Sequence, residues 1–137
     1  MVVLYAEETM TWTKQMIKKL KVFNNHIMRW MCGAKLRDKQ SILSLHAKTR
    51  VKNIIPIIKL KKLQWFGHLK RSKQQVKVTF KGLMEGKRKK GRPVRRWRDD
   101  ISEWCGGASI VELGRKTNNR KAWRRHCHAV CDSGERV

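Results

Sequence analysis

The sequence predicts a mainly α-helical protein, a small basic bundle of about five helices with a flexible basic loop and at most a short strand or two. Two observations support this fold class. Apolar residues recur at spacings of three and four through most of the 137-residue chain, the period of a helix that buries one face. Capping residues and glycines also flank these stretches where helices begin and end.

The first predicted helix covers residues 14–32. Thr13 can cap its N-terminus, and Gly33 stands where a left-handed residue commonly ends a helix. An apolar stripe follows one face, formed by Met16, Leu20, Phe23, Ile27, Trp30 and Met31. Because an apolar face at this period usually packs inward, we expect the stripe to be core.

Two helices are predicted next. Asp38 and Ser41 can open a short one that reaches Ala47. Its inward residues are expected to be Ile42, Leu43 and Leu45. Asn53 can cap a longer helix that runs to about Arg71 and is too rich in apolar residues for one narrow stripe. We therefore expect this longer helix to be enclosed on more than one side.

The pattern then changes twice. Residues 76–80 alternate between apolar and polar side chains, which predicts a short extended segment. A loop rich in glycine and charge follows over 85–92. A helix over about 94–104 then places Trp97, Ile101 and Trp104 on one face.

Two further helices complete the predicted bundle. Ser109 and Glu112 have the spacing of a capping box, which opens a helix that reaches about Thr117. Asn118 or Asn119 can cap the last helix. The residues that share its apolar face are Ala122, Trp123, Cys127 and Val130.

The charge of the chain points to a polyanionic partner. Lys and Arg number 34 against 10 Asp and Glu, a formal net charge of +24. Nucleic acid fits this charge, because each phosphate contact releases a bound counterion. An anionic membrane surface is a second candidate, but no segment approaches the ~20 apolar residues of a membrane span, and we expect no membrane. The remaining alternative is a solvated basic surface without a partner.

The basic residues concentrate in the helix over 53–71 and in the loop and helix over 87–98. Gly91 permits close approach of the backbone and Pro93 fixes an extended exit, so the Gly-Arg-Pro segment can follow a phosphate groove. It can also place Arg92 in a narrow A·T minor groove. The candidate phosphate-binding residues are Lys59, Lys61, Lys62, Lys70, Arg71, Lys87, Arg88, Lys89, Lys90, Arg92, Arg95, Arg96 and Arg98.

The four residues from Lys87 to Lys90 also match a nuclear import signal, which predicts a nuclear protein, with the cytoplasm as a second location. The residues before Glu7 lack the basic flank and length of a secretory signal, so the cysteines are expected to be reduced thiols.

Two other groups of residues suggest specific chemistry but have simpler explanations. Trp65 and His68 in a basic setting suggest base stacking, but aromatics at helical spacing are more often core. Asp99 and Asp100 look like a polymerase metal pair, yet they begin a predicted helix, where carboxylates favour the dipole. No third carboxylate accompanies them, and no nucleophile with a supporting base or phosphate-cradling loop is found.

Zinc is a weak possibility near the end of the chain. A structural zinc site needs four converging ligands, usually supplied as two close pairs, and the sequence has no CxxC pair. The candidates are Cys105, Cys127, His128 and Cys131. Buried or idle thiols explain these cysteines more simply, and the sequence predicts no metal and no other cofactor.

Four stretches taken in order resemble one known family. They are Glu8-Thr9-Met10-Thr11-Trp12-Thr13, Lys62-Leu63-Gln64-Trp65-Phe66-Gly67-His68, Glu85-Gly86-Lys87-Arg88-Lys89-Lys90-Gly91-Arg92-Pro93 with Trp97-Arg98-Asp99-Asp100-Ile101, and Asn119-Arg120-Lys121-Ala122-Trp123-Arg124. Together they resemble the C-terminal tail of the endonuclease-reverse transcriptases of non-LTR (LINE-type) retrotransposons. The resemblance covers about residues 4–131.

The resemblance implies that the polymerase palm and the endonuclease of the family lie upstream of this tail. The chain itself is then expected to be no enzyme and to take no small-molecule substrate. It implies a lead-in from the palm over 1–13, a thumb-like helical segment over 14–71, an extended basic linker over 72–93 and a helical tail over 94–131. Residues 132–137 are expected to be a disordered end.

The leading hypothesis is therefore a fragment that binds RNA or DNA, largely through phosphates, and does no chemistry. Two alternatives stay open. One is a host DNA-binding or chromatin-type protein derived from such an element, with the Gly91-Arg92-Pro93 loop as a minor-groove hook. The other is a pseudogene fragment without function.

Overall fold

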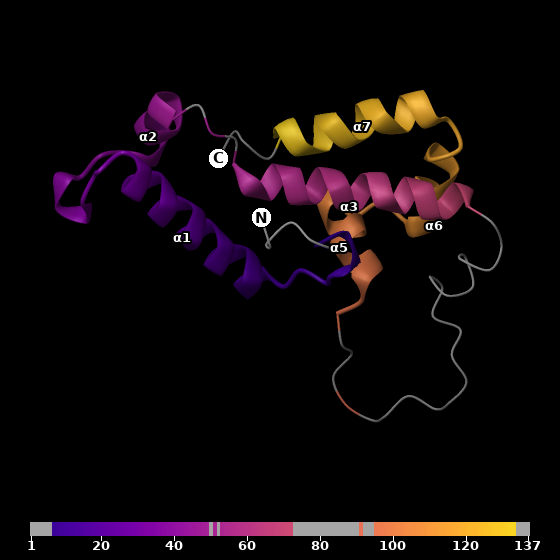
Figure 1. Cartoon of the computed structure of the whole chain (residues 1–137). Coiled ribbons are helices and arrows are strands. Elements are labelled where there is room, and N and C mark those ends of the chain that lie inside the picture. Colours follow the sequence, from indigo (N-terminus) through magenta and orange to yellow (C-terminus); the bar gives the residue numbers. More distant parts are fainter. Residues whose placement is uncertain (1–6, 50, 52, 73–90, 92–94, 134–137) are drawn as a thin grey trace.

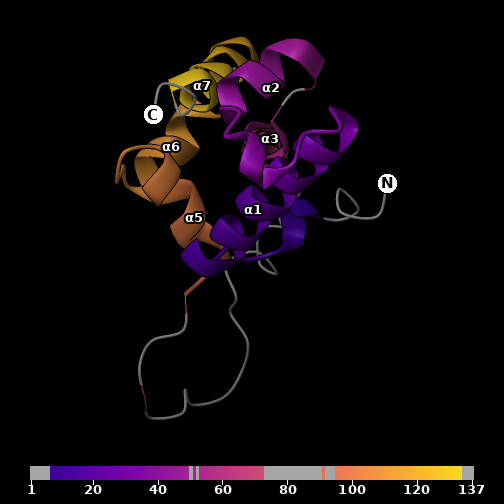
Figure 2. The ribbon, with the colours of Figure 1, turned by 90° about the vertical axis from the view of Figure 1, so that its left-hand side faces the viewer.

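The long helix α3 (Ile54–Arg71) lies at the centre of the protein, with several other helices packed on different sides of it (Figure 2). This computed structural model describes residues 7–49, 51, 53–72, 91 and 95–133. The 3-10 helix η2 (Glu7–Thr9) and the α-helices α1 (Lys14–Met31), α5 (Trp97–Trp104) and α7 (Arg120–Ser133) contact α3. The helix α2 (Ile42–Thr49) packs on α1 and α6 (Ile110–Lys116) on α5, while the 3-10 helix η3 (Leu36–Asp38) lies in the connection between α1 and α2. The mainly helical prediction is confirmed, with six α-helices and no strand among these residues.

The predicted caps explain where the helices begin. The side-chain oxygen of Thr13 accepts a hydrogen bond from the Met16 amide at 3.2 Å, and that of Asn53 accepts from the Ile55 amide at 3.1 Å. Gly33, after the end of α1, has a φ of 62°, the left-handed conformation that glycine adopts without strain. Each cap satisfies backbone groups that the helix itself leaves unpaired.

The C-terminal helices are capped in a slightly different way from the prediction. Ser109 caps α6 by accepting from the Val111 amide at 3.3 Å. Glu112 does not complete a capping box, because its carboxylate pairs with Lys116 at 2.9 Å, one turn further along α6. α5 begins at Trp97 rather than at 94, because Arg96 is its N-cap residue.

The main core joins α3 to the three C-terminal helices. α7 runs antiparallel beside α3, and α5 and α6 cover another side of it (Figure 1). Side chains from all four helices meet in one buried cluster: Leu63, Phe66, Ile101, Leu113, Trp123, Cys127 and Cys131. Burial of each large apolar side chain stabilises the fold by about 1.5–3 kcal/mol. α3 is thus enclosed on more than one side, as its composition predicts.

The prediction that the stripe of α1 is core is wrong. Phe23 is 50% exposed and Trp30 is 81% exposed, and Met28, which lies outside the predicted stripe, is the residue of α1 that is buried. Leu43 of α2 is also exposed, against expectation. The period of a helix reveals that it has an apolar face, but it does not reveal whether the chain supplies a partner for that face.

Several sequence predictions lie outside the described residues. They are the extended segment over 76–80, most of the basic loop over 85–92 and the end of the chain over 134–137. No helix within the described part of the chain is long and apolar enough to cross a membrane.

Candidate nucleic-acid interface

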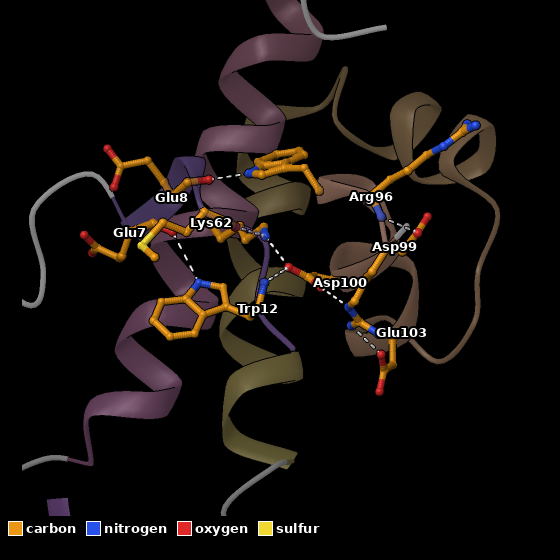
Figure 3. A network of polar contacts seen from close by, with 11 residues as sticks. Glu7, Glu8, Trp12, Lys62, Arg96, Asp99, Asp100 and Glu103 are labelled. Atoms are coloured by element: carbon orange, nitrogen blue, oxygen red, sulfur yellow. Dashed lines mark hydrogen bonds and ion pairs between the residues drawn. The ribbon is translucent and has the colours of Figure 1, made fainter. Parts of the chain in front are cut away.

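A buried carboxylate at the start of α5 organises the polar interior. Asp100 has no exposed surface. Its Oδ2 accepts hydrogen bonds from the Trp12 amide, at 2.7 Å, and from the Lys62 ammonium, while its Oδ1 accepts from Nε of Arg95 at 2.7 Å (Figure 3). The sequence predicts that Asp99 and Asp100 are ordinary acids at the start of a helix. This is correct for Asp99, whose carboxylate accepts a hydrogen bond from the amide of the N-cap residue Arg96 at 2.7 Å. The prediction does not foresee that Asp100 is buried and accepts hydrogen bonds from three residues.

The structure corrects the prediction for Lys62. Its side chain is fully buried, pairs with Asp100 and donates to the carbonyl of Met10 at 2.5 Å, so it cannot reach a phosphate. Its ammonium also lies 4.9 Å from the centre of the Trp97 ring. Burial lowers the pKa of Lys62, while the hydrogen bond and charge of Asp100 favour its protonated form. Lys62 is therefore a structural residue that fixes the N-terminal segment to α3 and α5.

Two further candidates form ion pairs with carboxylates of the protein itself. Lys61 forms an ion pair with Glu7 at 2.8 Å, and that carboxylate is fully buried. Arg95 pairs with both Asp100 and Glu103, the second at 2.5 Å (Figure 3). Hydrogen bonds to these carboxylates raise the pKa of Arg95 despite the opposing effect of desolvation. Because their charges are already compensated, these two side chains are weaker candidates for phosphate contacts.

Five candidates remain in the described residues. Arg71 and Arg96 are exposed, while Lys59, Lys70 and Arg98 are partly exposed. The ammonium groups of two of these lysines lie over aromatic rings, Lys59 over Trp104 and Lys70 over Phe66. The candidates Lys87, Arg88, Lys89, Lys90 and Arg92 lie outside the described residues.

A small polar cavity lies between the second half of α3 and the first half of α7. Its volume is about 160 Å³, and its lining residues are Gln64, His68, Arg71, Arg120, Trp123 and Arg124. Arg71 is held in place because its Nη1 donates to the carbonyl of Thr117 at 2.8 Å. Arg120 and Arg124 were not among the predicted contacts, although they belong to one of the stretches that carry the family resemblance. Only the antiparallel packing of α7 on α3 brings them to Arg71.

An aromatic pair lies at the edge of this cavity. The rings of Trp65 and His68 stack with their centres 5.3 Å apart and their planes at 18°. Trp65 is 36% exposed, so the prediction that aromatics at helical spacing are core is wrong for this residue. The prediction holds for Trp123, which is buried and donates from Nε1 to the carbonyl of Leu63 at 3.1 Å.

The zinc candidates are not arranged as a metal site in the described part of the chain. Cys127 and Cys131 are buried in the core, Cys105 is partly exposed at the end of α5, and His128 is exposed on α7. Within the described ranges, no three His, Cys, Asp or Glu side chains are grouped so that they could hold a metal ion.

The thiols are predicted to differ strongly in reactivity. Burial raises the pKa of Cys127 to about 12, and the nearby Cys131 and Cys105 add to this effect. Since only the thiolate reacts, we expect iodoacetamide at about pH 8 to modify the buried Cys127 much more slowly than the partly exposed Cys32. Mass spectrometry of timed digests measures both rates. In urea the two rates should converge, whereas equal rates in the folded protein would show that Cys127 is not buried.

No model of a known protein family matches the chain, and no curated protein or solved structure matches it significantly.

Proposed function

We propose that this chain binds the phosphate backbone of RNA or DNA and does no chemistry by itself, as the thumb-side and tail region of a non-LTR retrotransposon reverse transcriptase. The observation that carries the binding proposal is the unequal use of charge. The acidic residues are mostly engaged in internal contacts, whereas many of the basic residues face solvent.

Most of the described acidic side chains form hydrogen bonds or ion pairs within the protein. Eight of the ten acidic residues lie in the described ranges, and six of these eight accept a hydrogen bond or form an ion pair with a neighbour. These six are Glu7, Asp38, Asp99, Asp100, Glu103 and Glu112. Few carboxylates are therefore left to neutralise the surface.

Many of the exposed cations lie on helices that contain almost no acidic residue. α1 and α3 contain no acidic residue, and α7 has one, Asp132 near its end. Exposed basic side chains on α1 and α7 include Lys14, Lys18, Lys19, Lys21, Arg120, Lys121, Arg124 and Arg125. A surface of this kind attracts polyanions over a distance set by the ionic strength.

Binding through phosphates predicts a steep dependence on salt. For four phosphate contacts on duplex DNA, the affinity should fall by about a hundredfold between about 50 and about 200 mM salt. Fluorescence anisotropy with labelled RNA and DNA measures this slope. A peptide nucleic acid of the same sequence is the matched control, because it carries the bases without the phosphates. Binding that does not change with salt, or equal binding of the uncharged control, contradicts the proposal.

A further inference from the structure

We propose that the cavity between α3 and α7 holds a phosphate group of single-stranded nucleic acid while a neighbouring unpaired base stacks on Trp65. This inference rests on the proposed function and deepens it. It names the class of strand and the place on the protein where that strand is held.

The lining of the cavity is cationic and rich in hydrogen-bond donors. Arg71, Arg120 and Arg124 reach it from two helices, together with Gln64 and His68, and none of its six lining residues is acidic. No hydrogen bond or ion pair joins the side chain of Arg120 or Arg124 to another part of the described chain. Guanidinium groups so placed repel one another, and an anion between them relieves that repulsion.

The size and construction of the cavity suit a phosphate. Its volume of about 160 Å³ leaves room for a group larger than one water molecule. The planar fork of arginine matches the oxygen atoms of a phosphate in a bidentate manner. Arg71 is positioned in advance by the carbonyl of Thr117, and Trp123 by the carbonyl of Leu63. These two of the six lining residues are therefore in place before a ligand arrives.

The aromatic pair beside the cavity favours a single strand. His68 lines the cavity and stacks on Trp65, so the site for a phosphate and an exposed indole ring are adjacent. Consecutive phosphates and bases of a nucleic acid alternate along the strand, and unpaired bases stack readily on aromatic side chains. In a duplex the faces of the bases are covered by their neighbours, so the indole would find no base to stack on.

Two double variants of α7 test the arginine pair with matched charge. Arg120→Ala with Arg124→Ala removes the two cavity arginines, whereas Lys121→Ala with Arg125→Ala removes two exposed cations one position further along the same helix, outside the cavity. Both change the net charge equally. Anisotropy with a labelled oligothymidine measures the affinity, and circular dichroism confirms that each variant folds.

We expect the cavity variant (Arg120→Ala with Arg124→Ala) to bind the oligothymidine at least about tenfold more weakly. Its dependence of log affinity on log salt should be shallower by about 0.7, the value of one phosphate contact on a single strand. The control variant (Lys121→Ala with Arg125→Ala) should lose less than about threefold in affinity, since the two side chains that it removes lie on the exposed surface outside the cavity. Equal losses for both pairs overturn the inference but leave the proposed function intact. Failure of the unmodified protein to bind at about 50 mM salt overturns the proposed function itself.

Trp65→Ala tests the stacking on the other helix. We expect it to weaken binding of the oligothymidine about tenfold and to leave binding of a duplex unchanged, because base stacking on an aromatic side chain acts on unpaired bases. An equal loss for both ligands contradicts the proposed role of Trp65.

Inorganic phosphate separates a strand site from a site for the free anion. Phosphate should compete with the oligothymidine for the unmodified protein. It should no longer compete for the variant that lacks Arg120 and Arg124. Phosphate could instead raise the melting temperature of the unmodified protein while the variant that lacks Arg120 and Arg124 still binds the oligothymidine normally. In that case the cavity holds a free anion only, and the inference is wrong.

Discussion

Asp100→Asn is expected to lower the free energy of unfolding by about 3–5 kcal/mol, the largest effect of any single change considered. The substitution keeps the shape of the side chain but leaves the ammonium of Lys62 buried without its counterion. It also weakens the acceptor for the Trp12 amide, which holds the N-terminal segment against α3 and α5. Because small proteins are stable by only about 5–15 kcal/mol, urea denaturation should show a large shift of the midpoint.

Asp99→Asn is the matched control for this prediction. It is the neighbouring aspartate on the same helix, but it is exposed, and its carboxylate accepts a hydrogen bond from the amide of Arg96. We expect it to cost less than about 1 kcal/mol, in the range of a helix-capping contact. In the Asp100→Asn background, Lys62→Met should recover part of the loss by removing the unpaired charge. Similar costs for the two Asp→Asn variants would show that the buried pair does not hold the fold together.

Gly67→Ala is expected to destabilise the protein by about 1–3 kcal/mol and to weaken oligonucleotide binding with it. A Cβ atom at this position would lie 2.6 Å from Cδ1 of Trp123 and closer still to its Nε1. Trp123 cannot move away without losing its hydrogen bond to Leu63 and its place in the core. The clash therefore pushes α7 from α3 and opens the cavity that their arginines share. Thermal unfolding and anisotropy measure the two losses.

Gly114→Ala provides the opposite case in the same fold. Its new Cβ would approach only the flexible side chain of Lys70, with the nearest carbon at 3.3 Å. Alanine is also the better helix former by about 1 kcal/mol in the interior of a helix. We expect Gly114→Ala to be neutral or slightly stabilising. A Gly67→Ala protein as stable as Gly114→Ala would disprove the close packing of Trp123 on α3.

Local signals explain how much of the fold could be predicted from the sequence. Thr13, Asn53 and Ser109 cap helices where expected, because a cap depends on residues within one turn of it. The enclosed position of α3 also followed from its own composition. Whether the apolar face of α1 is buried could not be predicted, because that depends on which distant segments of the chain cover it.

The candidate site was less predictable because it depends on contacts between distant residues. Lys62 and its neighbour Lys61 look alike in a basic stretch, and the sequence does not reveal that Lys62 meets a carboxylate 38 positions away. Arg120 and Arg124 likewise meet Arg71 only because α7 folds back along α3. The resemblance to a retrotransposon tail named the stretches concerned, but it assigned no contact between them.

The exposed face of α1 also has a consequence for how copies of the protein behave toward one another. Phe23, Trp30 and Met31 form apolar surface that water covers poorly, and such surface tends to bring molecules together. The net charge of +24 keeps the copies apart, over about 30 Å at 0.01 M salt but only about 3 Å at 1 M. A bound polyanion neutralises the same charge. Under the proposed function, loading with nucleic acid would therefore weaken the repulsion that keeps the exposed α1 faces of separate copies apart.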